Sequence, residues 1–167
     1  MRNFDLVIPV YKEKKILNLL DYVFSNSKKI NNIFICYDEV EDETIKIIKK
    51  SKYIQNKNIK FIKNKFLGPC EAVKAGISAS TSEAVIVYPA DDFENAELLD
   101  QMYTHYLKGY DIVCPSRFMK GGAIKNCPLI KYLIVKCVSL CLLYLSSLNI
   151  KDPTNGFRFF SRKIIEK

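Results

Sequence analysis

The sequence predicts an α/β fold with three layers: a mainly parallel central sheet covered by helices on both faces. Short runs of β-forming apolar residues alternate along the chain with longer segments in which apolar residues recur at helical spacing. This alternation is typical of parallel sheets, because the crossover between two parallel strands places a helix against the sheet. The length of 167 residues suits a single domain, so we assign residues 1–167 to one.

The first half of the chain predicts three strand–helix pairs. The expected strands are Phe4–Val10, Asn32–Tyr37 and Asn58–Ile62. The helices expected after them are Glu13–Ser27, Asp42–Lys52 and Pro69–Ala79. Pro69 suits the start of the third helix, because the first helical turn has no use for the N–H that proline lacks.

The second half predicts two more strands around a fourth helix. The strands are Ala84–Tyr88 and Asp111–Cys114. We expect Asn95 to be the N-cap of a helix that runs to Lys108 and that Gly109 ends. A last helical segment covers residues 128–150, and it has too few consecutive apolar residues to span a membrane. We predict a membrane-interface helix here, with a buried core helix as the alternative.

Charge and cysteine content exclude several classes of protein. The net charge is +8, and thirteen lysines lie in the first 65 residues. We interpret most of them as solvated helix faces, with attraction to an anionic partner as the alternative. Neither an arginine-rich block nor an aromatic RNA-binding motif is present, so nucleic acid is not expected as a partner. Six cysteines without a C-x-x-C pair, and one histidine, argue against zinc and for a reduced, cytoplasmic protein.

Polar residues follow four of the predicted strands. They are Tyr11 and Glu13, then Asp38, then Asp91 and Asp92, then Ser116 and Arg117. Parallel sheets bind ligands beyond the carboxyl ends of their strands, so the four clusters predict a binding site at one edge. The chain lacks G-x-G-x-x-G, the P-loop G-x-x-x-x-G-K-[ST] and the nucleophile elbow G-x-S-x-G, which argues against dinucleotide-binding, P-loop and serine hydrolase folds.

Six motifs in order resemble those of family 2 glycosyltransferases, which have the GT-A fold. VIPVYKE (7–13) is similar to their V-I-P-x-Y-N-E, and YDEVEDET (37–44) to a variant of their second-strand acidic motif. The other four segments are GPCEAVKAGISAS (68–80), YPADDFEN (88–95), CPSRFMKGG (114–122) and DPTNGFRFFSRK (152–163). The subgroup that the chain resembles most is the dolichol- and polyprenol-phosphate sugar synthases.

Three positions depart from the family pattern. Lys12 replaces the asparagine of the first motif, Pro89 replaces the first aspartate of D-x-D, and Pro115 replaces a glycine. The sequence also stops at Lys167, directly after the last motif, whereas family members usually continue. These features leave a truncated, a minimal or an inactive family member as alternative interpretations.

The resemblance implies roles for named residues. Asp91, with Asp92 as an additional ligand, would hold Mg²⁺ or Mn²⁺, which prefer oxygen ligands and would stabilise the diphosphate leaving group. The implied nucleotide-binding residues are Pro9, Tyr11, Glu13, Asp38, Ala90 and Asp91. Arg117 and Arg158 are candidates for clamping phosphates, because a guanidinium binds them bidentately. Asp152 is a candidate base for a hydroxyl acceptor.

The implied function is inverting transfer of a sugar from a UDP- or GDP-sugar to a polyprenyl-phosphate or saccharide acceptor. Such an enzyme is expected at the cytoplasmic face of a membrane, in the synthesis of cell-envelope polysaccharides. Two alternatives remain: a non-catalytic member that binds nucleotide sugars, and a basic module that binds membrane surfaces.

Overall fold

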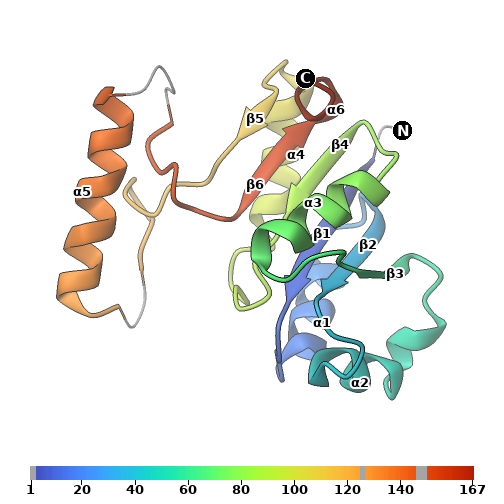
Figure 1. The fold of residues 1–167 in the computed structure, drawn as a ribbon. Coiled ribbons are helices and arrows are strands. Elements are labelled where there is room, and N and C mark those ends of the chain that lie inside the picture. The colour runs from blue at the N-terminus through green and yellow to red at the C-terminus, as the bar shows by residue number, and fades with distance from the viewer. Residues whose placement is uncertain (1–2, 125–126, 146–149) are drawn as a thin grey trace.

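The fold is built on one six-stranded sheet, in the order β3-β2-β1-β4-β6-β5 (Figure 1). The computed structural model describes residues 3–124, 127–145 and 150–167. The strands are β1 (Phe4–Val10), β2 (Ile30–Tyr37), β3 (Ile59–Lys63), β4 (Ala84–Val87), β5 (Ile112–Val113) and β6 (Arg158–Ser161). The first four are parallel, and β6 runs antiparallel to both β4 and β5. The predicted α/β fold with a mainly parallel sheet is therefore confirmed.

Helices cover both faces of the sheet. Those of the described chain are α1 (Ile16–Asn26), α2 (Glu43–Lys49), the 3₁₀ turn η1 (Lys52–Gln55), α3 (Pro69–Ala79), α4 (Leu98–Leu107), α5 (Leu129–Leu145) and α6 (Arg162–Ile165). Alternate residues of β1 divide the core, since Leu6 and Ile8 pack with α1, α2 and α4, whereas Val7 packs with Ala72 of α3. Both faces of the central strands are thus buried, as a parallel sheet requires.

Most predicted elements are present, and the differences have local causes. β1 and α3 have the predicted bounds. The helix predicted from Asp42 to Lys52 ends earlier, at Lys49, and η1 follows it from Lys52, where Ser51 accepts a hydrogen bond from the Tyr53 amide. The prediction of Asn95 as an N-cap is wrong: α4 begins at Leu98 after Glu97, and the Asn95 amide donates to Asp92 instead. β6 was not predicted as a strand.

α5 lies to one side of the sheet (Figure 1). Its buried residue is Ser139. Large apolar side chains along it are exposed, including Leu129, Ile130, Leu133, Ile134, Tyr144 and Leu145. A buried core helix, the alternative interpretation of this segment, is therefore wrong for Leu129–Leu145, while the last part of 128–150 includes residues outside the described ones. No helix within the described ranges is long and apolar enough to cross a membrane.

Close packing between α3 and the sheet depends on small residues. A Cβ added to Gly76 would lie 2.4 Å from Val7 Cγ1 and 2.7 Å from Cys36 Sγ, which is nearer than atoms pack. Ala72, one turn earlier, is also buried against the sheet. The spacing of four residues puts both on one face of the helix, so α3 approaches β1 and β2 through a stripe without long side chains.

We expect Gly76→Ala to destabilise the protein, because the new methyl group overlaps Val7 and Cys36. Alanine gains about 1 kcal/mol in helix propensity, and overpacking costs more, so we expect a net loss of about 1–2 kcal/mol in the free energy of unfolding. Urea unfolding measures it. The control is Ser78→Ala, at an exposed position of the same helix. Equal stability of the two variants would contradict this close contact.

Candidate active site

Strand polarity brings the predicted polar clusters to one edge of the sheet. The parallel strands β1, β2 and β4 end there, with Val10 beside Tyr37 and Val87 beside Val7. The antiparallel β6 begins at the same edge, because Arg158 pairs with Val87. β5 runs antiparallel to β6 and so leads Ser116 and Arg117 there as well. All four clusters, and the beginning of the 152–163 motif, therefore share this edge.

The loop after β1 is fixed by the start of α2. The Lys12 amide donates to Asp42 Oδ2 at 2.9 Å, and the Glu13 amide donates to Thr44 Oγ1 at 2.7 Å. Burial opposes ionisation of Asp42, but hydrogen bonds from Thr44 and the Lys12 amide outweigh it and lower the pKa of this carboxyl. The motif 37–44 thus contains two structural residues that sequence reasoning missed, since their partners lie about 30 positions earlier in the chain.

Lys12 has left-handed backbone, with φ of 52°. This conformation costs an ordinary L-residue about 1–2 kcal/mol, and asparagine adopts it more readily. The family pattern has asparagine at this position, so the backbone gives a physical reason for that preference. The Lys12 side chain is exposed and its ammonium lies 4.9 Å from the centre of the Tyr11 ring.

The implied nucleotide-binding residues lie along this edge. Pro9 is half-buried in β1, Tyr11 is 63% exposed just beyond it, and Ala90 packs at the margin of the core. Asp38 follows β2, and its carboxylate accepts hydrogen bonds from the Gly68 amide at 3.1 Å and from Asn64 Nδ2 at 2.6 Å. Because a carboxylate has about four acceptor positions, Asp38 keeps capacity for a further donor.

The two adjacent carboxylates after β4 have different surroundings. Asp91 is exposed, whereas Asp92 accepts two contacts of 2.7 Å from the Asn95 amide and so shapes the turn toward α4. Among the described residues, no three His, Cys, Asp or Glu side chains are grouped as a metal site. The oxygen donor of Asp91 still fits Mg²⁺ or Mn²⁺, which need few protein ligands where phosphates supply the others.

Arg117 and Asp152 form a bidentate ion pair. Arg117 Nε and Nη2 each lie 2.8 Å from an oxygen of Asp152, and the Arg117 amide donates to the same carboxylate at 3.0 Å. The Asp152 side chain is fully buried. Burial opposes its ionisation, but the hydrogen bonds and charge of Arg117 outweigh burial and lower the pKa of Asp152. Two residues predicted for separate roles therefore contact each other.

Arg158 stabilises the loop that precedes it. Its Nε donates to the Asn155 carbonyl at 2.8 Å, and its Nη2 donates to the Pro153 carbonyl. Asn155 in turn donates to the Pro115 carbonyl at 2.9 Å, which joins this loop to the segment before Arg117. Beneath the edge, the Tyr88 and Phe157 rings meet edge-to-face with centroids 4.8 Å apart. The positions around Arg158 are thus held from several sides.

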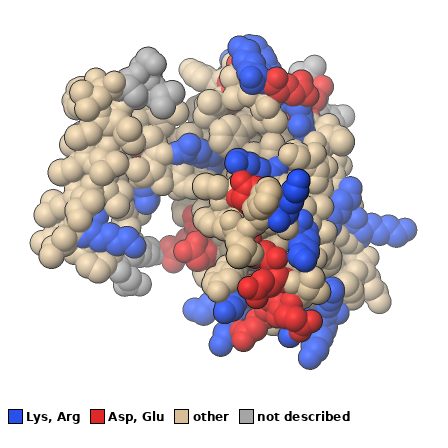
Figure 2. Space-filling model, viewed as in Figure 1, with Lys and Arg blue, Asp and Glu red and all other residues tan. Residues whose placement is uncertain are grey.

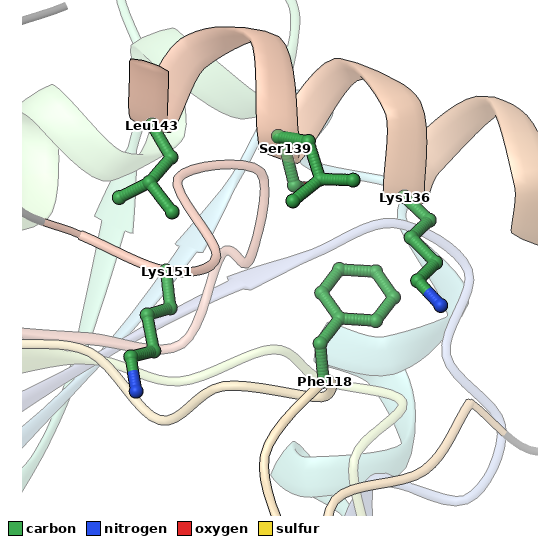
Figure 3. A pocket seen from close by; sticks show the side chains of 6 residues that line it. Phe118, Lys136, Ser139, Leu143 and Lys151 are labelled. Atoms are coloured by element: carbon green, nitrogen blue, oxygen red, sulfur yellow. The ribbon is translucent and has the colours of Figure 1, made fainter.

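A pocket of about 200 Å³ lies between α5 and the loop segments that carry Phe118 and Lys151. Figure 3 shows Lys136 and Lys151 on opposite sides of the Phe118 ring, with Ser139 and Leu143 above it on α5. Figure 2 shows that the α5 side of the molecule carries few charged side chains. The pocket therefore combines an apolar lining with two cationic side chains. It is lined by Phe118, Lys136, Ser139, Leu140, Leu143 and Lys151.

The sheet order, the antiparallel β6 and the acidic residues at the strand ends are those of the GT-A fold. The model of the family described as "Glycosyl transferase family 2" matches residues 5–167, so the chain belongs to that family. The predicted family is therefore confirmed. The match spans all six motifs.

Curated relatives match almost the whole chain. The dolichol-phosphate mannosyltransferase of Pyrococcus furiosus is 29% identical over 167 residues, which is 96% of this chain and 47% of the relative. A putative glycosyltransferase of Bacillus subtilis, CsbB, is also 29% identical, over 96% of this chain and 48% of the relative. The chain thus spans about half the length of these relatives.

Solved structures share the fold. Glucosyl-3-phosphoglycerate synthase from Mycobacterium tuberculosis, in complex with Mn²⁺, UDP and phosphoglyceric acid, has a TM-score of 0.70 at 14% identity. The match covers 98% of this chain and 57% of that one. Staphylococcus aureus TarS in complex with UDP-GlcNAc has a TM-score of 0.56 at 20% identity, over 71% of this chain and 38% of that one. At these identities the likeness concerns the fold.

We expect the Arg117–Asp152 pair to stabilise the protein in a pH-dependent way. Because the folded-state pKa of Asp152 is lowered, its contribution is present above the unfolded pKa of about 3.9 and is lost as pH falls through the folded pKa. At pH 7, Asp152→Asn should cost about 3 kcal/mol, because it leaves Arg117 without its anionic partner.

The measurement is urea unfolding of wild type and Asp152→Asn between pH 7 and pH 2. The stability difference between them should shrink below about pH 4. The control is Asp91→Asn, an exposed carboxylate, for which we expect a difference within about 0.5 kcal/mol throughout. A difference for Asp152→Asn that is constant with pH would contradict the prediction.

Proposed function

We propose that this domain transfers a sugar, with inversion, from a UDP- or GDP-sugar to a polyprenyl-phosphate or saccharide acceptor, assisted by Mg²⁺ or Mn²⁺. The observation that carries the proposal is the convergence of Asp38, Asp91 and the Arg117–Asp152 pair at one sheet edge. The relatives support it, since one is a dolichol-phosphate mannosyltransferase and a structural neighbour holds Mn²⁺ and UDP.

On the donor side, Asp38 would accept an N–H of the base, with Pro9, Tyr11, Glu13 and Ala90 around the nucleoside. Asp91 would hold the divalent cation, whose positive charge stabilises the diphosphate as it leaves. Asp92 is a weaker candidate ligand, because its oxygens already accept from Asn95. Arg158 lies at the same edge and would add positive charge near the proposed diphosphate, whereas the charge of Arg117 is already balanced by Asp152.

On the acceptor side, a lipid phosphate fits the pocket beside α5. Lys136 and Lys151 would attract the phosphate, while Phe118, Leu140 and Leu143 would contact the first part of the lipid chain. An acceptor phosphate oxygen would attack the anomeric carbon as the bond to the diphosphate breaks, and a single displacement of this kind inverts the centre. This nucleophile is already ionised and needs no base, so Asp152 can remain paired with Arg117.

The exposed apolar side chains of α5 support placement at a membrane. Its large side chains would enter the interface of the cytoplasmic leaflet, and the net charge of +8 favours an anionic surface. This orientation would present the pocket beside α5 to a lipid acceptor.

A second candidate function is nucleotide-sugar binding without transfer. Pro89 favours it, because a proline side chain has no oxygen that could bind the ribose or a metal ion. Nucleotide binding by wild type, with no sugar transferred to any acceptor of a membrane extract, would support this second function and contradict the first.

We expect Asp91→Ala to lower metal-dependent turnover of the UDP- or GDP-sugar by about 100-fold or more, because the cation would lose its protein ligand. Release of the nucleoside diphosphate in the presence of Mn²⁺ measures turnover. The matched control is Asp92→Asn, which should have a smaller effect because Asp92 is occupied by Asn95. Turnover that Asp91→Ala leaves unchanged would overturn the metal assignment.

We expect the double variant Lys136→Gln/Lys151→Gln to raise the KM for a polyprenyl phosphate about tenfold, because both cations beside the proposed phosphate are removed. The KM for the nucleotide sugar should change less than about twofold. Lys108→Gln, at the exposed end of α4, removes a distant positive charge as the control. An equal rise in both variants would indicate a general charge effect, and no rise would contradict the acceptor site.

A further inference from the structure

Asn64 is a buried side chain beside the proposed base-binding carboxylate. It follows β3, and its amide N–H continues the sheet by donating to the Tyr37 carbonyl at 2.9 Å. Its side-chain nitrogen donates to Asp38 Oδ1 at 2.6 Å. The nitrogen must be the atom that faces Asp38, because the opposite assignment would place two acceptor oxygens in contact. Asp38 therefore fixes the orientation of the Asn64 amide.

The other end of that amide is unusual. Asn64 Oδ1 is closed off from solvent, and among the described residues it accepts no hydrogen bond. The residue as a whole is 6% exposed. Buried amide oxygens nearly always have a partner, because leaving one unpaired loses a hydrogen bond that water would otherwise make. The oxygen belongs to the same amide group as the nitrogen that contacts Asp38, so an unpaired acceptor lies close to that carboxylate.

We propose that Asn64 determines base specificity, and that the base is guanine. Guanine carries two neighbouring donors on one edge, the N1–H and the exocyclic N2 amino group. Asp38 would accept one of them and Asn64 Oδ1 the other. Uracil carries one N–H between two carbonyl oxygens, so one of these would face Asn64 Oδ1 and repel it. The inference rests on the proposed function, since it assigns the base to the same donor site.

Because Asn64 Oδ1 is closed off from solvent, neighbouring groups must shift for a base to reach it, and we assign this movement to the adjoining 65–67 segment. Phe66 and Leu67 are 61% and 73% exposed, so little packing opposes that movement. The segment joins β3 to α3 and ends at Gly68, whose amide donates to Asp38 (Figure 1). Movement here would therefore leave the sheet and the body of α3 in place. Recognition of the base would combine the fixed Asp38–Asn64 pair with movement of the 65–67 segment.

The test is a double-mutant cycle of protein and nucleotide. Binding of GDP, IDP and UDP to the full chain with Mn²⁺ is measured by calorimetry for wild type and Asn64→Ala. IDP differs from GDP only by lacking the exocyclic amino group. Wild type should bind GDP about tenfold more tightly than IDP, because one hydrogen bond changes the affinity by about that factor. It should also bind GDP more tightly than UDP. In Asn64→Ala the ratio of GDP to IDP affinity should fall to within about twofold of one.

Three results would overturn the inference. They are equal GDP and IDP affinities in wild type, a preference of wild type for UDP, and an unchanged GDP to IDP ratio in Asn64→Ala. The first two results are measured on wild type alone, so they test the inference even if Asn64→Ala does not fold. If wild type binds none of the three nucleotides, the proposed function itself is overturned. Binding of UDP with no role for Asn64 would instead leave the proposed function standing.

Discussion

The Arg117–Asp152 ion pair joins the two halves of the candidate site. Its partners are 35 positions apart in the sequence, and α5 lies between them. A fully buried carboxylate is costly unless it is paired and hydrogen-bonded, and Arg117 supplies both a backbone and two side-chain donors. Thr154 adds a further donor at 3.1 Å. The pair therefore holds together the two ends of the segment that carries α5 away from the sheet.

The loop after Asp152 depends on that closure. It leads into β6, whose antiparallel pairing with β4 brings Arg158 to the edge where Asp91 lies. The contact of Asn155 with the Pro115 carbonyl fixes the same loop a second time. Ser139, the buried residue of α5, lies 3.5 Å from Thr154 through their hydroxyl oxygens. The pocket beside α5 is thus positioned by the same group of contacts that positions the strand edge.

Sequence patterns predicted the fold well where the information is local. The apolar run of β1, and the helical spacing and early Pro69 of α3, indicate both elements with the bounds observed. β6 is four residues long and pairs with strands distant in sequence, so no local period marks it. Asparagine is a favoured N-cap residue, but the side-chain amide of Asn95 donates to Asp92 instead. The N-cap preference of a residue type does not predict such a contact.

The candidate site was predictable in location and less so in its internal contacts. Polar residues after successive parallel strands predict a shared edge, since topology alone brings them there. Which of them pair with each other depends on side-chain geometry. Arg117 and Asp152 were assigned separate roles, and Asn64 was not singled out, because nothing local distinguishes an asparagine beside Asp38 from one in a turn.

The two departures at Lys12 and Pro89 differ in kind. At Lys12 the requirement is conformational: the backbone is left-handed and its amide is satisfied by Asp42, so lysine weakens stability without removing a ligand. At Pro89 the backbone role is kept, since its carbonyl accepts from the Asp92 amide at 3.2 Å. What is lost there is an oxygen beside the proposed nucleotide site. The proposed donor site would therefore rely more on Asp91 and on the Asp38–Asn64 pair than a site that has both aspartates.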